Sequence, residues 1–206
     1  MTGIILVNLI SLNGREIVWD GRVIRECTGA DFEAILSIIN DGAQAYRSVI
    51  PVDRWLEPYM PAGELRHEIN TGVLFAGAEA GGSLVAVMGL QIVKDVTLIR
   101  HAYVRTACQR RGEGSRLLQH LMKQTRLPVL IGTWKSARWA LRFYEKHAFN
   151  LIEGEEKDRL LRSYWNIPSW QVKSSVVMAD QQAIEELVRY SDEPFGAIGD
   201  DGGHHI

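Results

Sequence analysis

Three apolar segments follow one another between residues 73 and 104, separated only by short turns. Gly81-Gly82 joins segment 73–80 to segment 84–93, and Lys94-Asp95 joins the latter to segment 96–104. A Gly-Gly pair between two apolar runs is typical of a tight β-hairpin. The chain therefore predicts three consecutive strands, and any fold that it adopts must contain them as neighbours.

Helical and strand patterns surround this meander. We predict strands over 23–27, 128–133, 149–153 and 172–179, and helices over 31–46, 115–126, 136–147 and 181–190. In the first of these helices Ile35, Ile38, Ile39 and Gly42 share one face, and a further short helix carries Leu65 and Ile69 inward. This order predicts an α/β fold with a mixed, mostly antiparallel central sheet flanked by helices on both faces.

The chain has 206 residues, which suits one domain. We assign 22–180 to that domain and 1–21 to an N-terminal appendage, in which Ile4–Ile10 and Glu16–Trp19 form either a hairpin about Asn13-Gly14 or a leader. The C-terminal part, 181–206, is expected to hold a helix and then a disordered Gly/Asp-rich tail.

Charge and composition exclude several classes of protein. The net charge of -2 argues against a nucleic-acid partner, which requires a basic face. A membrane span takes about 20 apolar residues, and the sequence holds no such run. Cys27 and Cys108 are too few for a disulfide framework, and no His/Cys cluster has zinc spacing, so we expect no metal and a cytoplasmic protein.

The segment between the third strand and the next helix carries the strongest chemical signal. It reads Gln109-Arg-Arg-Gly112-Glu-Gly114-Ser115. The start of a helix exposes unpaired N–H groups, glycines allow close approach of a ligand, and the arginines add positive charge. These features predict a pyrophosphate site, and a solvated turn is the alternative on spacing alone. Leu117 replaces the third glycine of a dinucleotide fingerprint, and the Gly-Lys of a P-loop is missing.

A second motif lies in segment 136–149. Ser136 is a candidate N-cap, and the helix after it places Ala140, Leu141 and Tyr144 on one face. From the pattern alone, Tyr144 is either an amphipathic core residue or a functional group at the edge of the core.

Together the two motifs resemble the GCN5-related N-acetyltransferase (GNAT) superfamily, in particular a bacterial subgroup. Gln109-x-x-Gly112-x-Gly114 is similar to its acetyl-CoA loop, and Phe143-Tyr144-Glu145-Lys146-His147-x-Phe149 is similar to its later helix-to-strand segment. Segment 98–104 and the pairs Tyr59-Met60 and Tyr164-Trp165 add to the likeness, which covers roughly residues 22–180.

The resemblance implies acetyl-CoA as co-substrate and a role for each motif. The strand residues Ala102, Tyr103 and Val104 would offer backbone groups to the pantetheine arm of the coenzyme. The pyrophosphate would be held by Gln109, Arg110, Arg111, Gly112, Glu113, Gly114 and Ser115. Tyr144 would protonate the departing thiolate, since a tyrosine hydroxyl remains protonated at neutral pH.

Three positions depart from the family pattern or from the chemistry of its loop. Ser136 stands where asparagine is frequent, which puts a contact with the pantetheine arm in doubt. Ala148 stands where glycine is usual, and a left-handed alanine there would cost about 1 kcal/mol. Glu113 lies within an anion loop, so its carboxylate is expected to point away from the phosphates.

A general base is harder to assign. His101 is the first candidate, because histidine side chains titrate near neutral pH and this one lies on the strand that lines the expected cleft. Its neighbour Arg100 should face the opposite side of the sheet. A structural histidine is the alternative, Glu79 and Glu57 are fallback bases, and Cys108 as a covalent nucleophile is a less favoured route.

These expectations lead to one function and two rivals. We expect transfer of acetyl from acetyl-CoA to a primary amine of a small molecule, by direct attack in a ternary complex. One rival is a non-catalytic acyl-CoA-binding or sensor domain, since fold does not fix function. The other is a protein N-terminal or lysine acetyltransferase. Segment 47–60 is either a core-covering flap or a substrate wall. The sequence does not determine the oligomeric state, and a homodimer is one alternative because similar proteins are often dimers.

Overall fold

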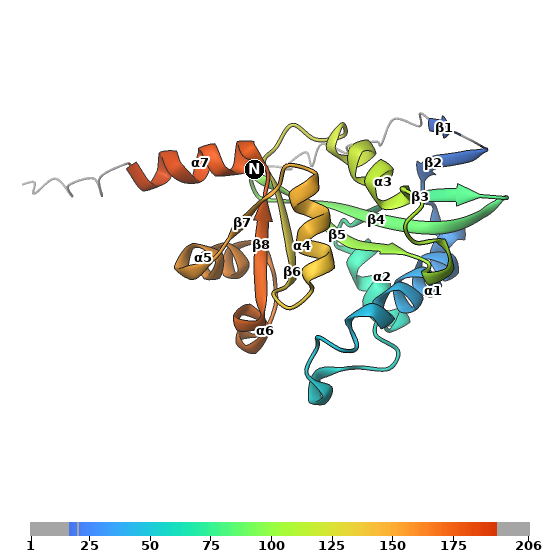
Figure 1. The fold of residues 1–206 in the computed structure, drawn as a ribbon, viewed down its shortest axis with the longest axis horizontal. Coiled ribbons are helices and arrows are strands. Elements are labelled where there is room, and N and C mark those ends of the chain that lie inside the picture. Colours follow the sequence, from blue (N-terminus) through green and yellow to red (C-terminus); the bar gives the residue numbers. More distant parts are fainter. Residues whose placement is uncertain (1–16, 20, 193–206) are drawn as a thin grey trace, which may run out of the picture.

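A computed structural model describes residues 17–19 and 21–192, which form one eight-stranded sheet in the order β1-β2-β3-β4-β5-β6-β8-β7 (Figure 1). The strands are β1 Ile17–Trp19, β2 Arg22–Glu26, β3 Leu74–Ala80, β4 Ser83–Val93, β5 Val96–Val104, β6 Val129–Trp134, β7 Asn150–Ile152 and β8 Ser175–Ala179. Neighbouring strands are antiparallel except β5 and β6, which are parallel. The predicted mixed, mostly antiparallel sheet is confirmed.

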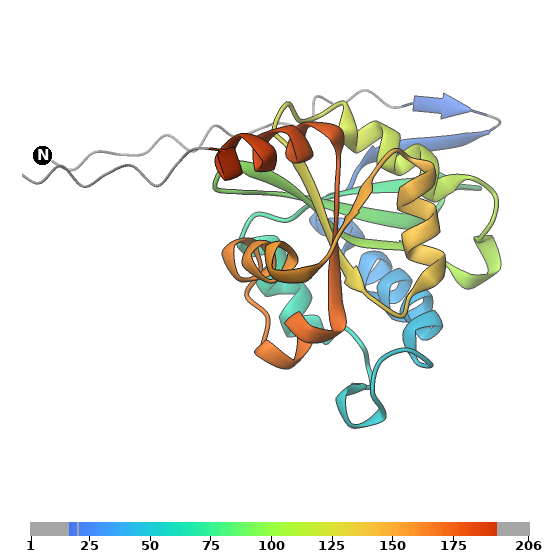
Figure 2. The same ribbon diagram turned by 60° about the vertical axis from the view of Figure 1, so that its left-hand side comes forward.

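Helices cover both faces of the sheet, as predicted (Figures 1 and 2). They are α1 Phe32–Ala43, α2 Ala62–Asn70, α3 Glu113–Met122, α4 Arg138–Lys146, α5 Gly154–Tyr164, α6 Ser169–Ser174 and α7 Gln181–Asp192. On one face, α3 and α4 enclose a core with Met88, Ile99 and Ile131. On the other face, α1 and α2 cover the half of the sheet that contains β3. On the same face as α1 and α2, the helices α5 and α6 cover the other half of the sheet, around Leu98 and Leu130.

The central meander matches the sequence prediction closely. The backbone at Gly81 and Gly82 has φ of 59° and 75°, and at Lys94 it has φ of 55°. Glycine adopts such positive values without a steric cost, which explains why the hairpin between β3 and β4 turns at this pair. The register then runs from Ala80 opposite Ser83 to Leu74 opposite Leu90.

The first helix also forms as its sequence predicts. The N–H of Thr28 donates to Oδ2 of Asp31 over 2.8 Å, so a capping interaction precedes α1 even though Asp replaces the usual Glu or Gln. Ile35, Ile38, Ile39 and Gly42 of α1 are all buried. In α2, Leu65 is buried, but Ile69 is 36% exposed, so the prediction for Ile69 is wrong. The helix ends one residue later, and its last turn extends beyond the core.

Two segments after residue 153 differ from expectation. The charged stretch 154–162 is the helix α5, whose Leu160 and Leu161 are buried beneath the sheet. The predicted strand 172–179 begins only at Ser175, because residues 169–174 form the short helix α6 and Val172 is buried as part of it. Short apolar runs such as 172–179 fit either periodicity, so local pattern alone could not separate the two states.

The sheet begins within the segment that was assigned to the appendage. Strand β1 pairs antiparallel with β2, with Ile17 opposite Ile24 and Trp19 opposite Arg22. The other strand of the expected hairpin, Ile4–Ile10, lies outside the described residues, as does tail 193–206. The predicted C-terminal helix is present as α7.

Two irregularities open the sheet at its centre. The parallel register between β5 and β6 runs only from Thr97 opposite Val129 to Ile99 opposite Ile131, although both strands continue beyond it. Strand β5 also contains a bulge, because Arg100 lies opposite Gly89 but Tyr103 lies opposite Val87. The extra residue has φ of 49° at His101. A bulge bends a strand and increases its twist, so β5 and β6 separate where the side chains of the site lie.

Candidate active site

Two cavities meet where β5 and β6 separate. The loop cavity, of about 580 Å³, lies on the α3–α4 face, and segment 109–115 forms part of its wall. The strand cavity, of about 160 Å³, is lined by β5 and β6 beyond their paired region and by residues of α5 and α6. The residues common to both cavities are Tyr46, Ala102, Tyr103 and Tyr144. The two cavities are therefore adjacent, with these four residues forming part of the wall of each.

The wall of the loop cavity includes the first turn of α3. Gly112 is the N-cap residue with φ of 92°, and within the described chain no side chain caps this helix. The N–H groups of the first turn thus lack intrahelical partners and carry the positive end of the helix dipole. Such a helix start beside a cavity is suited to bind a phosphate group.

Loop 109–115 is held in shape by its own carbonyl groups. The amide of Gln109 donates to the carbonyl oxygen of Val104 over 3.3 Å, and the guanidinium of Arg111 donates to that of Ala107 over 3.2 Å. Arg110 adopts a left-handed backbone with φ of 62° and lines the cavity. These bonds position the loop, and Gln109 lines the cavity together with Arg110 and the glycines, whereas Arg111 is not among the described residues that line it.

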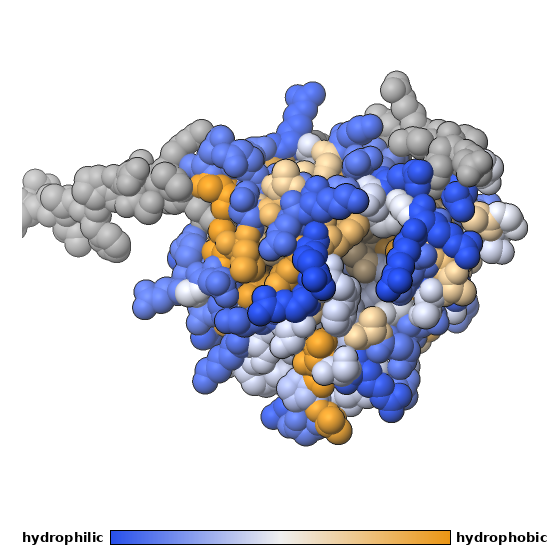
Figure 3. All heavy atoms as spheres, viewed as in Figure 1, coloured by the Kyte–Doolittle hydropathy of each residue, from blue (hydrophilic) through white to orange (hydrophobic). Residues whose placement is uncertain are grey.

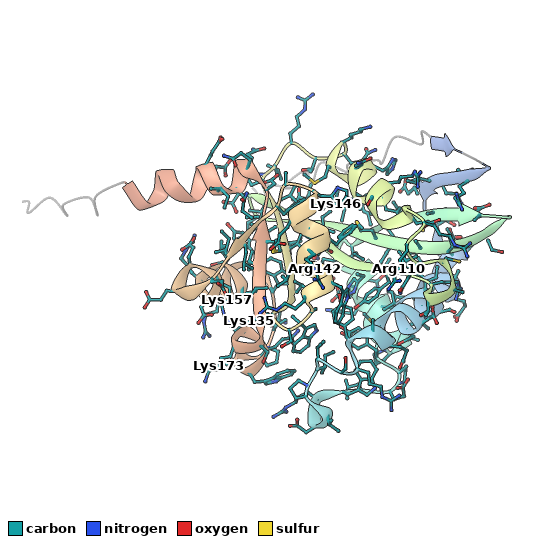
Figure 4. The ribbon with its side chains drawn as sticks, viewed as in Figure 1. Arg110, Lys135, Arg142, Lys146, Lys157 and Lys173 are labelled. Atoms are coloured by element: carbon teal, nitrogen blue, oxygen red, sulfur yellow. The ribbon has the colours of Figure 1, made fainter. Side chains whose placement is uncertain are left out.

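Basic side chains flank the same cavity (Figure 4). Arg110 extends from the loop, and Arg142 and Lys146 extend from α4. In the part of the chain that the structure describes, these three cations form no ion pair. The other labelled bases include Lys157, which donates to the carbonyl of Val172, and Lys135, which lies 3.4 Å from Glu153. Figure 3 shows hydrophilic side chains bordering a less polar hollow on this face.

Glu113 lies within the anion loop but is directed at the sheet. Its side chain is 2% exposed, and Oε1 lies 3.4 Å from Nε of Arg22 on β2. The carboxylate is therefore paired with a cation on a neighbouring element. This arrangement agrees with the expectation that Glu113 turns away from the anion-binding groups.

Ser136 does not take the position that the sequence suggested. Helix α4 begins at Arg138, and its N-cap residue is Ala137, whose backbone has ψ of 66°. The N-cap prediction for Ser136 is wrong, because the chain needs one more residue to turn from β6 into the helix. Ser136 is exposed in that turn and is not among the described residues that line the loop cavity.

Tyr144 lies at the junction of the two cavities. It projects from α4, is 6% exposed and lines both. Burial raises the pKa of its hydroxyl far above the ordinary tyrosine value, with a further rise from Tyr46. The hydroxyl is therefore fully protonated at neutral pH and can act only as a proton donor. The helix that carries it ends at Lys146, and two residues later the backbone of Ala148 is left-handed with φ of 62°.

His101 and Arg100 lie on the same side of the sheet, contrary to the expected alternation. Nε2 of His101 lies 3.4 Å from Oε2 of Glu68, and a guanidinium nitrogen of Arg100 lies 2.9 Å from the same oxygen. The bulge explains this, because it inserts one residue and so lets consecutive side chains share a face. His101 also stacks on Phe75 with 5.9 Å between ring centroids. Both Arg100 and His101 line the strand cavity.

The two fallback bases lie outside both cavities. The carboxylate of Glu79 accepts a hydrogen bond from Nε of Arg25 over 2.9 Å, and that of Glu57 accepts one from the indole of Trp55 over 3.1 Å. Glu68 of α2 was not foreseen as a site residue. Its only sequence signal is its place three residues after the buried Leu65, which turns it toward the core.

Aromatic side chains of the strand cavity were also missed, because they come from distant segments. Tyr59 belongs to segment 47–60 and lines the strand cavity, where its ring centre lies 6.2 Å from that of Tyr103. The guanidinium of Arg54 in the same segment lies 5.0 Å from the ring centre of Trp170 on α6. Segment 47–60 is therefore a wall of the strand cavity at Tyr59 and also reaches α6.

A model of the acetyltransferase (GNAT) family matches residues 34–149, which is more than half of the chain. The chain belongs to the GNAT family of acetyltransferases. The likeness stated from the sequence is thereby confirmed, as are the expectations of an enzyme and of acetyl-CoA, the co-substrate of GNAT enzymes. No curated protein sequence matches the chain.

Solved structures agree on the GNAT fold. An acetyltransferase from Streptococcus agalactiae 2603 has a TM-score of 0.60 at 15% identity, covering 79% of this chain and 99% of its own. The PaiA N-acetyltransferase from Thermoplasma acidophilum, in complex with coenzyme A, has a TM-score of 0.59 at 17% identity, covering 77% and 98%. The ribosomal-protein-S18-alanine N-acetyltransferase from Escherichia coli has a TM-score of 0.55 at 18% identity, covering 77% and 92%.

The GNAT match divides the site in an informative way. It includes every described residue that lines the loop cavity. The match ends at residue 149, whereas Leu161, Trp165, Ile167, Gln171 and Ser175 of the strand cavity lie beyond it. Among the described helices, none is long and apolar enough to cross a membrane.

Proposed function

We propose that this GNAT enzyme transfers the acetyl group of acetyl-CoA to a primary amine of a small molecule, by direct attack in a ternary complex. The observation that carries the proposal is the junction of the two cavities at Tyr144. The loop cavity would hold the donor and the strand cavity the acceptor. Direct transfer requires both molecules to meet at one buried point beside a proton donor, and this junction supplies such a point.

The donor site is supported by charge and by backbone geometry. The first turn of α3 and the cations Arg110, Arg142 and Lys146 would hold the phosphate groups of the coenzyme. Beyond Ile99, the edge of β5 that faces β6 has left the parallel register. Ala102, Tyr103 and Val104 would therefore pair with the extended pantetheine arm as with an added strand. Ser136, exposed in the turn before α4, would make at most a peripheral contact.

The acyl transfer balances with two residues of this chain. The amine nitrogen attacks the thioester carbonyl, the C–N bond forms and the C–S bond breaks. Tyr144 donates its proton to the departing thiolate, and His101 accepts the proton that the amine loses. Backbone N–H groups of β5 would polarise the carbonyl oxygen.

Glu68 supports the role of His101. Burial by itself raises the pKa of Glu68, but the hydrogen bond with His101 and the charge of Arg100 outweigh it, so the pKa lies below the ordinary value. An ionised Glu68 would accept a hydrogen bond from Nε2–H of His101, 3.4 Å away, and in that tautomer the other ring nitrogen carries no proton. That tautomer is the one a general base requires.

The size of the strand cavity favours a small acceptor over a protein. At about 160 Å³ it has room for a compact group and not for an extended peptide. A protein acetyltransferase would need an open groove to admit a peptide. In this cavity Tyr59 from segment 47–60 and Trp165 from the segment after α5 both occupy the wall, which narrows the space for a peptide. A sensor domain would need neither the buried proton donor nor the Glu68–His101 pair.

The free thiols Cys27 and Cys108 suit the reducing cytoplasm, which we propose as the location.

Calorimetric titration with acetyl-CoA, followed by measurement of CoA release with a panel of amines, tests the proposal. We expect one-to-one binding of acetyl-CoA and CoA release that depends on the amine. Binding without release in the presence of any amine would support the sensor alternative. Absence of binding at millimolar acetyl-CoA would reject the donor site.

A further inference from the structure

The strand cavity has an unusually aromatic wall. Its lining includes the rings of Tyr46, Tyr59, Tyr103, Trp134, Tyr144 and Trp165. Its volume of about 160 Å³ is large enough for one aromatic ring, and its exposed lining combines polar with apolar groups. Flat rings pack on one another in offset or edge-to-face geometry, so a wall of this kind favours a planar aromatic guest.

The tyrosines of this wall are neutral and lie close to one another. Burial raises the pKa of Tyr46 to about 12 and also raises those of Tyr59 and Tyr103. The ring centre of Tyr103 lies 6.1 Å from that of Tyr46 and 6.2 Å from that of Tyr59. The wall therefore offers aromatic rings and uncharged hydroxyl groups to a guest.

The ionic groups of the cavity are paired. Of the described residues that line it, none is an aspartate or glutamate, and the charged one is Arg100. The guanidinium of Arg100 donates to Glu68 over 2.9 Å and to Gln91 over 2.8 Å. A second ammonium group on an acceptor would find no carboxylate here, and a carboxylate on an acceptor would compete with Glu68 for Arg100. Burial of an unpaired charge is strongly unfavourable.

One wall is fitted closely to the separated strand. A Cβ atom built at Gly132 of β6 would lie 3.1–3.3 Å from atoms of the Trp165 indole. The indole therefore packs directly against the backbone of β6. Trp165 lies beyond residues 34–149, which the family model matches, so this wall is outside the part of the chain that the model describes.

We propose that the acceptor is a monoamine with a single aromatic ring, an arylalkylamine, whose ring lies between Trp165 and Tyr59 and whose amine points to His101 and Tyr144. This inference rests on the proposed function and narrows its acceptor. It excludes diamines, polyamines and amino acids with a free carboxylate as preferred substrates.

Steady-state kinetics with matched amines tests the inference. We compare 2-phenylethylamine with hexylamine, 1,4-diaminobutane and phenylalanine, which remove the ring, add a second ammonium, and add a carboxylate. We expect kcat/KM for 2-phenylethylamine to exceed each of the others by about tenfold or more, the scale on which a fitted pocket discriminates. Equal or higher kcat/KM for diaminobutane or phenylalanine would overturn the aromatic acceptor and leave the acetyltransferase proposal standing.

A non-reacting analogue separates failure of the inference from failure of the proposed function. In 2-phenylethanol a hydroxyl replaces the amine, and its binding is followed through tryptophan fluorescence. Saturable quenching without turnover of any amine would retain the aromatic site and reject catalysis. If 2-phenylethanol causes no quenching and 2-phenylethylamine is not turned over preferentially, the aromatic site is rejected.

Two substitutions locate the binding. Trp165→Leu should lower kcat/KM for 2-phenylethylamine at least tenfold and change that for hexylamine much less. Trp170→Leu is the matched control, since Trp170 stacks on Trp134 with ring centroids 6.1 Å apart but does not line the cavity. An unchanged ratio of the two amines in Trp165→Leu, with a native melting temperature, would contradict the assigned ring position.

Discussion

The hydroxyl oxygen of Ser115 and Nε2 of His147 lie 2.9 Å apart, which joins the first turn of α3 to the residue that follows α4. Burial lowers the pKa of His147, and the neighbouring charge of Lys146 lowers it further. Neutral His147 therefore holds the first turn of α3 against the helix that carries Tyr144. A single imidazole links two helices that line the loop cavity.

This link predicts a pH dependence of stability. Because the folded pKa of His147 lies below the unfolded value of about 6.5, the unfolded state binds more protons once the pH falls below that value. Stability is then lost as the pH drops through about 6.5 toward the folded pKa. Urea unfolding of wild type and His147→Gln at pH 7.5 and 5.5 measures the free energy of unfolding. This free energy should fall less between the two pH values in the variant than in wild type. Equal losses would show that His147 does not titrate in this way.

Tyr144→Phe tests the proton donor. The hydroxyl is buried at the junction of the cavities, so its removal takes away the donor but leaves the ring in place. We expect kcat to fall about 100-fold or more and the Kd for acetyl-CoA to stay within about twofold. Tyr164→Phe is the control, because its hydroxyl bonds to Asp95 over 2.9 Å, away from both cavities. Wild-type kcat in Tyr144→Phe would remove this residue from the chemistry.

Gly114→Ala tests the phosphate site without disturbing the protein. A Cβ built at Gly114 would lie 3.6 Å or more from Phe143 and Val104, which is ordinary contact, and this glycine has no positive φ. The variant should therefore fold normally but place a methyl group in the loop cavity. We expect acetyl-CoA to bind at least about tenfold more weakly, a loss of about 1.4 kcal/mol.

Gly63→Ala serves as its control, because Gly63 lies in the helix α2 with open space around it. Its affinity for acetyl-CoA should match that of wild type. Native affinity in Gly114→Ala as well would show that the coenzyme does not approach this turn.

Ala148→Gly should stabilise the protein. Ala148 is exposed and left-handed with φ of 62°, a conformation that is unfavourable for every residue with a Cβ. We expect the free energy of unfolding to rise by about 1 kcal/mol and the melting temperature by about 2–4 °C. Ala34→Gly, in the interior of α1, should have the opposite sign. A melting temperature that falls in Ala148→Gly would show that the strain is relieved by neighbouring contacts.

The fold was predictable where local signals are strong. The pair Gly81-Gly82 determines the hairpin that orients β3 and β4, and the spacing of Ile35, Ile38 and Ile39 fixes the inner face of α1. The place of loop 109–115 in a cavity wall was equally accessible, since its glycines, arginines and helix start are contiguous. Segment 169–179 was not, because six residues of helix pass directly into five of strand and no turn signal separates them.

The acceptor side of the site depends on relations that no local pattern contains. Glu68 joins Arg100 and His101 across 32 and 33 positions of sequence. The aromatic wall assembles from segments as distant as Tyr46 and Trp165. Alternation along a strand predicts opposite faces for Arg100 and His101, and the bulge that overrides it comes from the pairing of β5 with β4.

The bulge also has a consequence for how the site could be gained or lost. Ala102 and Val104 pack toward the α3–α4 face and Tyr103 toward the other, as in a regular strand that passes directly from Arg100 to Ala102. His101 is thus one residue more than the strand needs. Its deletion would leave the edge of β5 at Ala102 and Val104 in register and remove the proposed base, so under the proposed function a change of one codon in length would separate binding of the coenzyme from activation of the amine.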